Sequence, residues 1–71
     1  MIDETVIIDF PVPVEVTNTM QDVEDAYKKD GELGPFLNWV DTLDVLCKNC
    51  YAAGAITKKQ WDKIMSRYPL E

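Results

Sequence analysis

The sequence contains no histidine, the side chain most often used as a general base and a common metal ligand. It also lacks a run of about 18 apolar residues that would cross a membrane, a phosphate loop and a recognisable nucleophile motif. The start, Met1-Ile2-Asp3-Glu4, is acidic and has no basic segment of the kind that opens a signal peptide. These absences predict a cytoplasmic protein that is not an enzyme and has no cofactor or small-molecule substrate.

Basic residues are scarce, since seven lysines and arginines stand against 13 acids and give a net charge of −6. The charge is uneven: residues 1–46 hold eleven acids and two lysines, whereas residues 47–71 hold five cations and two acids. An acidic chain repels phosphate backbones, so nucleic acid is disfavoured as a partner. With 71 residues, the chain has room for a single small domain, residues 1–71.

An alternating pattern near the start is the most informative feature. Every even position from 6 to 16 is apolar: Val6, Ile8, Phe10, Val12, Val14 and Val16. Period-two alternation is typical of a strand with one buried face. Because prolines at 11 and 13 cannot donate to a ladder, such a strand belongs at a sheet edge. We expect residues 5–16 to form an extended arm that pairs as a short hairpin, with a second copy of the chain, or with another protein's sheet edge.

The remainder of the chain predicts three helices, at residues 20–29, 35–53 and 58–68. Asn18 or Thr19 is the expected N-cap of the first helix, and Gly31 its C-cap. Pro35 suits the first position of the second helix, which Gly54 ends. The predicted fold class is mainly α, a three-helix domain with an N-terminal extended or β arm.

The third predicted helix has the clearest local signature. Thr57 and Gln60 form the sequence pattern of a capping box, in which each side chain bonds to the backbone N–H of the other residue. Ile56 and Trp61 stand at the two positions of a hydrophobic staple around this cap. Pro69 stops the helix.

Cys47 and Cys50 form a C-x-x-C motif, but no other cysteine is present to complete a four-ligand zinc site. A redox motif has its first cysteine at a helix N-terminus, whereas these two stand near the end of the second predicted helix. We therefore interpret them as reduced thiols of the core. Around Gly31, the positions where a calcium loop needs acids hold other residues, so we predict no metal site.

Two charged sets are candidate contact surfaces. The acidic set comprises Asp22, Glu24, Asp25, Asp41 and Asp44. Its ordinary interpretation is a pair of solvated helix faces; the alternative is that these acids stand in for phosphates on a basic target, as in anti-CRISPR or anti-restriction inhibitors of phages and mobile elements. The basic set comprises Lys58, Lys59, Lys63 and Arg67, which would face DNA if the last two helices formed a helix-turn-helix.

The last part of the chain carries a family resemblance. Its motif comprises Leu43 and Leu46, then Ala53-Gly54-Ala55-Ile56-Thr57, then Gln60-Trp61, then Ile64 and Tyr68. Residues 43–68 resemble SHOCT, a family of short helix-hairpin domains, although Gln60 stands where that family usually has an acid. The resemblance implies a bacterial, non-enzymatic element for oligomerisation or interaction.

Three hypotheses follow from the sequence. The first is a protein–protein interaction module that binds another protein, or a second copy of itself, by strand addition through the arm. The second is an acidic inhibitor that mimics nucleic acid, and the third is DNA binding through the last helix.

Overall fold

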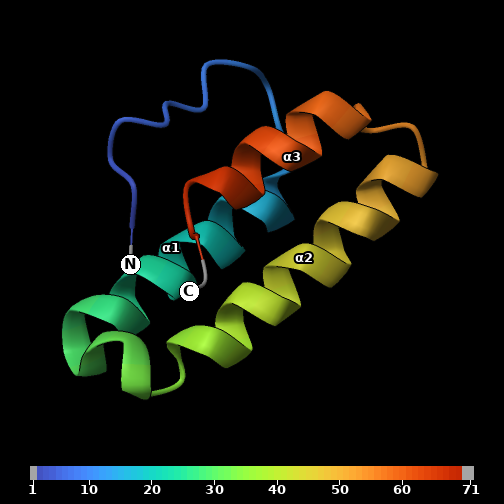
Figure 1. The fold of residues 1–71 in the computed structure, drawn as a ribbon. Coiled ribbons are helices and arrows are strands. Elements are labelled where there is room, and N and C mark those ends of the chain that lie inside the picture. The colour runs from blue at the N-terminus through green and yellow to red at the C-terminus, as the bar shows by residue number, and fades with distance from the viewer. Residues whose placement is uncertain (1, 70–71) are drawn as a thin grey trace.

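The computed structural model describes residues 2–69, apart from the side chain of Leu33. These residues form helices α1 (Val14–Asp30), α2 (Phe36–Ala52) and α3 (Lys58–Ser66), with a short 3-10 helix η1 (Gly31–Leu33) after α1. The mainly α fold class is confirmed. Helix α2 runs antiparallel to α1, and α3 turns back along α2, so that the three helices form a small bundle (Figure 1).

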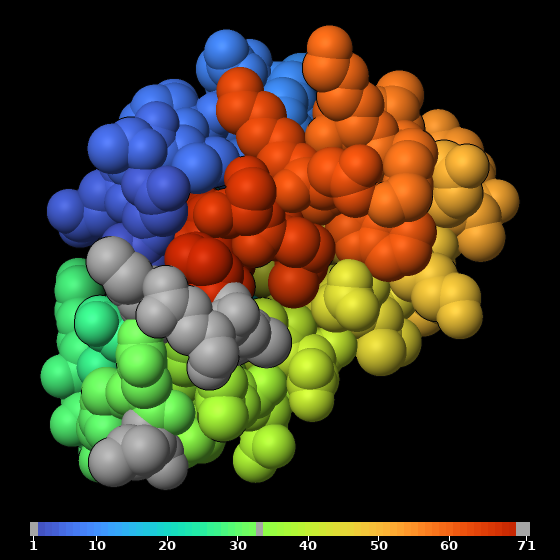
Figure 2. Space-filling model, viewed as in Figure 1, coloured from blue at the N-terminus to red at the C-terminus, as the bar shows by residue number. Residues whose placement is uncertain are grey.

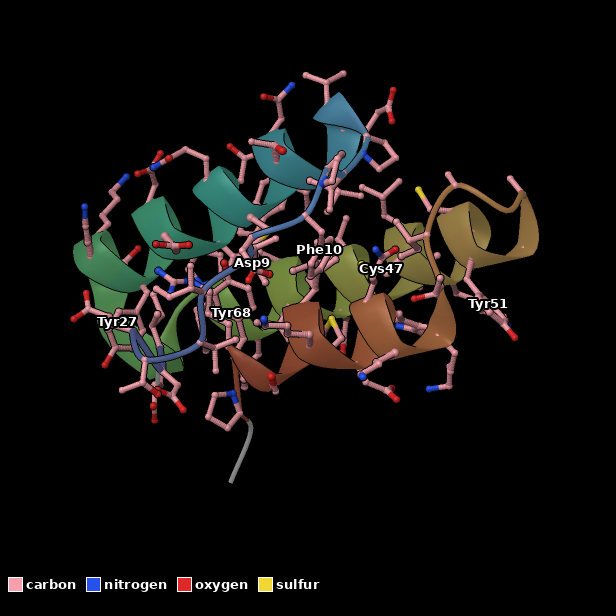
Figure 3. The ribbon with its side chains drawn as sticks, turned by 90° about the horizontal axis from the view of Figure 1, so that it is seen from above. Asp9, Phe10, Tyr27, Cys47, Tyr51 and Tyr68 are labelled. Atoms are coloured by element: carbon pink, nitrogen blue, oxygen red, sulfur yellow. The ribbon has the colours of Figure 1, made fainter. Side chains whose placement is uncertain are left out.

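The segment before α1, residues 2–13 and called the arm from here on, is extended but forms no strand within the described chain. The arm passes between α1 and α3 on the side of both helices that faces away from α2 (Figure 3). It therefore acts as a fourth layer of the bundle. In the space-filling view the arm fits closely against α3 (Figure 2).

The predicted start of the first helix is wrong, because α1 begins at Val14 rather than at residue 20. Val14 and Val16 therefore belong to a helix and not to the extended arm. Pro13 precedes the helix with a φ of −55°, which already has a helical value, and Asn18 and Thr19 lie inside the helix instead of capping it. Burial explains the extension: Val16 is 0% exposed and lies one helical turn before Met20, on the same face of α1.

The other helix ends agree closely with the sequence. Gly31 has a φ of 67°, and its N–H donates to the Tyr27 carbonyl as a C-cap. Helix α2 begins one residue after Pro35 and ends at Ala52, two residues before Gly54, which has a φ of 79°. Both glycines adopt a left-handed conformation that other residues rarely adopt.

The capping box of α3 is confirmed. The Gln60 N–H donates to Thr57 Oγ1 at 3.0 Å, and the Thr57 N–H donates to Gln60 Oε1 at 2.9 Å. The helix ends at Ser66, two residues earlier than predicted. Tyr68 consequently leaves the helix and turns its ring into the core, where it is 1% exposed.

The core lies where the three helices meet. Its fully buried side chains come from all three helices and the turns beside α3: Val16, Val23, Phe36, Val40, Leu43, Cys47, Ile56, Ile64 and Tyr68. Apolar arm residues pack against this cluster from the side opposite α2, namely Ile2, Ile8, Phe10 and Val12. No helix of the described chain is both long and apolar enough to cross a membrane.

Candidate docking groove between the arm and α1

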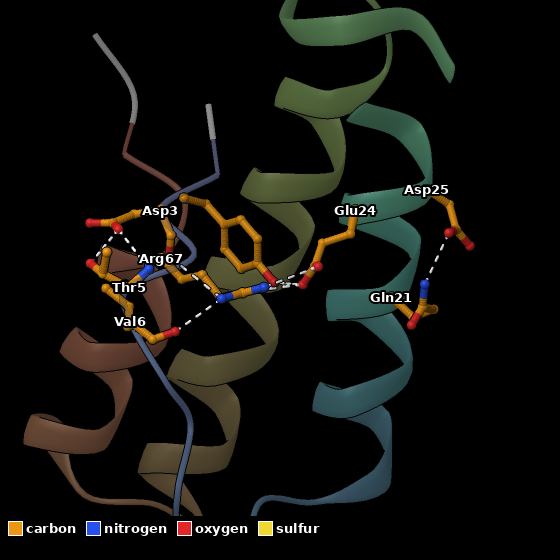
Figure 4. A network of polar contacts seen from close by, with 8 residues as sticks. Asp3, Thr5, Val6, Gln21, Glu24, Asp25 and Arg67 are labelled. Carbon is orange, nitrogen blue, oxygen red and sulfur yellow. Dashed lines mark hydrogen bonds and ion pairs between the residues drawn. The ribbon is translucent and has the colours of Figure 1, made fainter. Parts of the chain in front are cut away.

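Arg67, just after α3, fixes the beginning of the arm. Its Nη1 donates to the Val6 carbonyl at 2.9 Å, and its own carbonyl accepts from the Asp3 N–H at 2.7 Å (Figure 4). A tight local turn supports this contact, because the N–H and the hydroxyl of Thr5 both donate to Asp3 Oδ1. These hydrogen bonds lower the pKa of the Asp3 carboxyl. The arm is thus attached to the end of α3 by backbone and side-chain bonds together.

The same arginine connects the arm to α1. Its Nε and Nη2 donate to the two carboxylate oxygens of Glu24 at 3.3 and 3.2 Å, and the Tyr68 hydroxyl donates to Glu24 Oε2 at 2.7 Å. The Arg67 and Glu24 side chains are only 17% and 26% exposed. Burial by itself would raise the pKa of Glu24, but the hydrogen bonds from Arg67 and Tyr68 outweigh it and lower the pKa. Glu24 is therefore a carboxylate in the folded protein, and it accepts hydrogen bonds from both Arg67 and Tyr68.

Arg67 and Tyr68, the two residues that donate to Glu24, both have raised pKa values. The hydrogen bond to Glu24 raises the pKa of the Arg67 guanidinium. Burial, followed by the hydrogen bond to Glu24, raises the pKa of the Tyr68 hydroxyl. These shifts keep all three groups in their ordinary charge states at neutral pH, so the Glu24 carboxylate accepts from a charged guanidinium and a neutral hydroxyl.

The middle of the arm has a second, more exposed attachment to α3. Lys63 Nζ lies 3.2 Å from Asp9 Oδ1 and 5.9 Å from the centre of the Phe10 ring. The Asp9 side chain is 71% exposed, so this ion pair contributes little to stability. The ion pair does engage Lys63, so this lysine is not free to bind another partner.

A groove of about 490 Å³ lies between the arm and α1 and is called the arm groove below. Its lining residues come from the arm, from one face of α1 and from the end of α3: Val6, Ile7, Ile8, Phe10, Val12, Thr17, Met20, Gln21, Glu24 and Arg67. The lining is mainly apolar, with polar groups contributed by α1 and by Arg67. Its volume is within the range of about 300–1,000 Å³ usual for ligand pockets.

The arm backbone beside the groove is unpaired. The N–H groups of residues 7–10 and of Val12 donate to no other residue of the described chain, and Pro11 has no N–H. Strand residues normally satisfy these groups in a ladder. An extended backbone held at both ends, with its N–H groups free, is therefore available to another polypeptide.

In the predicted arm site, several of the apolar side chains pack within the molecule, whereas the backbone N–H groups of residues 7–10 do not bind within the described chain. Val6, Ile8, Phe10 and Val12 are half-buried, and the last three pack against the chain's own core. Val16 is buried in α1, while Val14 is 64% exposed at the start of that helix. Ile7, which the alternation placed on the polar side, is 61% exposed and lines the arm groove. Of the even-numbered side chains, Ile8, Phe10, Val12 and Val16 are thus used within the molecule.

The basic set does not form a free surface. Lys58 pairs with Asp62 at 2.6 Å and lies 4.5 Å from the centre of the Trp61 ring. Lys63 and Arg67 bind Asp9 and Glu24, as described above. Lys59 alone among the four has no ion pair within residues 2–69. These contacts weaken the argument for DNA binding through α3.

The acidic set is divided between two helices. On α1, Glu24 belongs to the arginine network and Asp25 accepts from Gln21 Nε2 at 2.9 Å. On α2, Asp44 accepts from Trp61 Nε1 at 2.9 Å. Asp22 is exposed on α1 beside Asp25 in a shallow hollow of about 280 Å³. Asp41 is exposed on α2, so the five acids do not form one surface.

The two cysteines lie where the core-thiol interpretation places them. Cys47 is 0% exposed, and Cys50 is half-buried against the core. Burial, with smaller contributions from Cys50 and Asp44, raises the pKa of Cys47 to about 11. Cys47 is therefore a thiol at neutral pH and a poor nucleophile.

The contact among Glu24, Arg67 and Tyr68 is the functional feature that sequence reasoning missed. From the sequence alone, Glu24 is interpreted as part of a solvated acidic helix face, and Arg67 as part of a basic helix face. The two residues are 43 positions apart, and no local motif links them. A half-buried charge pair of this kind depends on the packing of α1 against the end of α3, which the sequence pattern does not specify.

Comparisons with known proteins add no relative. No protein-family model, no curated protein and no solved structure matches this chain.

Proposed function

We propose that this chain is a non-enzymatic protein–protein interaction module that binds an extended segment of another polypeptide along its arm. The observation that supports this most directly is the extended backbone of residues 7–12, whose N–H groups have no partner in the described chain. Strand addition uses such groups for affinity and neighbouring pockets for side-chain specificity. The arm groove, next to the same residues, supplies the pocket.

A foreign partner is favoured over a second copy. In this structure the apolar side of the arm already packs on its own core, so arm exchange between copies would replace these contacts without adding to them. The resemblance of residues 43–68 to SHOCT helix hairpins supports the same class of interaction protein.

A selection from randomised peptides tests the proposal. The full chain is used as bait, and each enriched peptide is then measured against two variants, Ile7→Asp and Val45→Asp. Ile7 is 61% exposed in the arm groove, and Val45 is 57% exposed on α2, so the two substitutions remove similar exposed apolar groups. We expect peptides with period-two alternation, whose binding falls at least tenfold with Ile7→Asp and is unchanged with Val45→Asp, because a charge among desolvated apolar groups costs more than about 1.4 kcal/mol.

Two outcomes would contradict strand addition. Enriched peptides with helical periodicity would show that another face of the bundle is used. Equal binding by both variants would show that the arm groove is not the site. Circular dichroism of both variants checks that each keeps the helices.

A second candidate function rests on charge. Because the cations of the C-terminal part are largely engaged internally, the acids of residues 1–46 dominate the surface charge, as in an inhibitor that mimics nucleic acid. Binding of that kind weakens steeply as salt rises. It would also depend on the exposed acids of α1 and not on Ile7, which separates it from strand addition.

A further inference from the structure

The arm is the least buried layer of the molecule. Within residues 2–69, every side chain that is buried in the core belongs to a helix or to the turns beside α3, and none belongs to the arm. The arm residues that pack on the core, Ile8, Phe10 and Val12 among them, are only half-buried. The three helices therefore complete their own core, and the arm covers it from outside.

The arm also closes a seam between two helices. Helices α1 and α3 each pack on α2, but no Cα atom of α1 lies within 8 Å of a Cα atom of α3. The arm occupies the space between them on the side away from α2 (Figure 3). Because apolar arm residues pack on the core there, departure of the arm would expose apolar surface along this seam.

Few hydrogen bonds hold the arm in this place. Within the described chain, those that join residues 2–12 to the rest of the molecule all end on Arg67 or Lys63. The pair between Lys63 and Asp9 is exposed and contributes little, so Arg67 provides most of the polar attachment. Arg67 is in turn positioned by Glu24 of α1.

The segment that joins the arm to α1 is a suitable hinge. Pro11 and Pro13 have no N–H, and residues 10–12 form no hydrogen bond within the described chain. The Pro13 carbonyl accepts from the Val16 N–H, but this bond belongs to the first turn of α1 and stays with the helix. Rotation of the backbone before Pro13 therefore breaks no hydrogen bond in the hinge itself.

We propose that the arm opens as a unit about residues 10–13 while the three helices stay folded, and that the contact between Arg67 and the arm holds it closed. Local opening costs less free energy than global unfolding where few buried contacts are lost, and the released residues regain conformational freedom. Opening also removes the arm groove, because its arm residues leave α1. The Arg67 contact thus regulates whether the groove is present. Only the effect on a bound segment rests on the proposed function.

Fluorine NMR of the full chain tests the opening, because its two phenylalanines report on the two parts separately. Phe10 lies in the arm, whereas Phe36 begins α2 and is 0% exposed. Both are replaced by para-fluorophenylalanine, and urea is added stepwise without any ligand. We expect the Phe10 resonance to reach its unfolded position at a lower urea concentration than the Phe36 resonance. Coincident transitions would show that arm and helices unfold together, and would overturn the inference.

A pair of variants tests the role of Arg67. Arg67→Gln removes the charged donor, whereas Asp9→Asn removes the exposed partner of Lys63. The position of the Phe10 resonance without urea gives the ratio of open to closed chain. We expect this ratio to rise at least about tenfold with Arg67→Gln and only about twofold with Asp9→Asn, with the Phe36 resonance unchanged in both.

Two results would contradict this role. Equal effects of the two variants would show that Arg67 does not hold the arm closed. A shift of the Phe36 resonance to its unfolded position in Arg67→Gln would show that Arg67 stabilises the helices and not the arm alone.

The opening and the proposed function fail separately. The opening is measured without a peptide, so a selection that enriches no alternating peptide would overturn strand addition and leave the opening standing. Coincident transitions in urea would overturn the opening and leave strand addition standing.

Discussion

At the scale of single residues, Glu24 is the polar side chain on which the arrangement depends most. Its carboxylate accepts from Arg67 and Tyr68, and Arg67 in turn holds the arm through Val6. Hydrogen bonds to charged groups that are mostly shielded from water stabilise a protein more than exposed ion pairs do. One side chain of α1 therefore controls whether the end of α3 and the arm stay in place.

Replacing Glu24 with glutamine is expected to lower the free energy of unfolding by about 1–3 kcal/mol, because Arg67 loses its charged partner in a half-buried position. Urea unfolding followed by circular dichroism measures this loss. Asp25→Asn is the control, since Asp25 is exposed one position along the same helix, and it should stay within about 0.5 kcal/mol of the original chain. A Glu24→Gln variant as stable as its control would contradict a structural role for this contact.

Acidification should act through the same residue. The pKa of Glu24 is lowered in the folded protein from an ordinary value of 4.5, so the unfolded chain takes up this proton first. The contribution is fully present above pH 4.5 and is lost as the pH falls through the folded pKa. We expect unfolding measurements across this range to show a shallower decline for Glu24→Gln than for the original chain. Parallel declines would assign the acid sensitivity to other carboxyl groups.

At the scale of elements, the structure differs from the sequence pattern at the boundary between the arm and α1. Val14 and Val16 would share one buried face of a strand, but in the helix Val16 is buried and Val14 is 64% exposed. Val16→Ala should therefore lower the free energy of unfolding by about 2 kcal/mol, from lost burial and a residual cavity. Val14→Ala should cause no loss, because alanine is the better helix former. Similar losses from the two variants in urea unfolding would restore the strand interpretation.

The elements that could be predicted from the sequence are those whose signals are local. Gly31, Gly54 and the Thr57–Gln60 capping box end or begin helices through the conformation and bonds of a few neighbouring residues. The start of α1 could not be predicted in this way. Over so short a stretch, Val12, Val14 and Val16 satisfy period two, and the valines and threonines beyond Pro13 have low helix propensity. The burial of Val16 against the other helices decides the conformation there.

The candidate site was predictable only in part, for a similar reason. The apolar alternation correctly marked Ile8, Phe10 and Val12 as an inward side of the arm. It gave no sign that Arg67 and Lys63 would be used to hold the arm, because both contacts join segments more than 50 residues apart. The arm groove exists only once these contacts place the arm beside α1.

At the scale of the whole molecule, the arm's attachment to its own chain predicts a monomer. Light scattering should give 8.1 kDa at every concentration and salt level, and small-angle scattering should give a compact particle close to the Cα radius of gyration of 11.5 Å. A dimer that persists at high salt would indicate that the arm is exchanged between copies. The same series repeated with Ile7→Asp would then show whether the exposed side of the arm contributes to that dimer.

The contact between Arg67 and the arm also has a consequence for the order in which the molecule folds. The helices meet through turns of a few residues, whereas the Val6–Arg67 bond closes a loop of 61 residues. Contacts of such long sequence separation form after local ones, because their loop entropy must be overcome first. The bundle therefore assembles early and the arm closes over it last. During synthesis the arm leaves the ribosome before α3 and has no place to dock until Arg67 has emerged, which leaves the apolar side of the arm open longest.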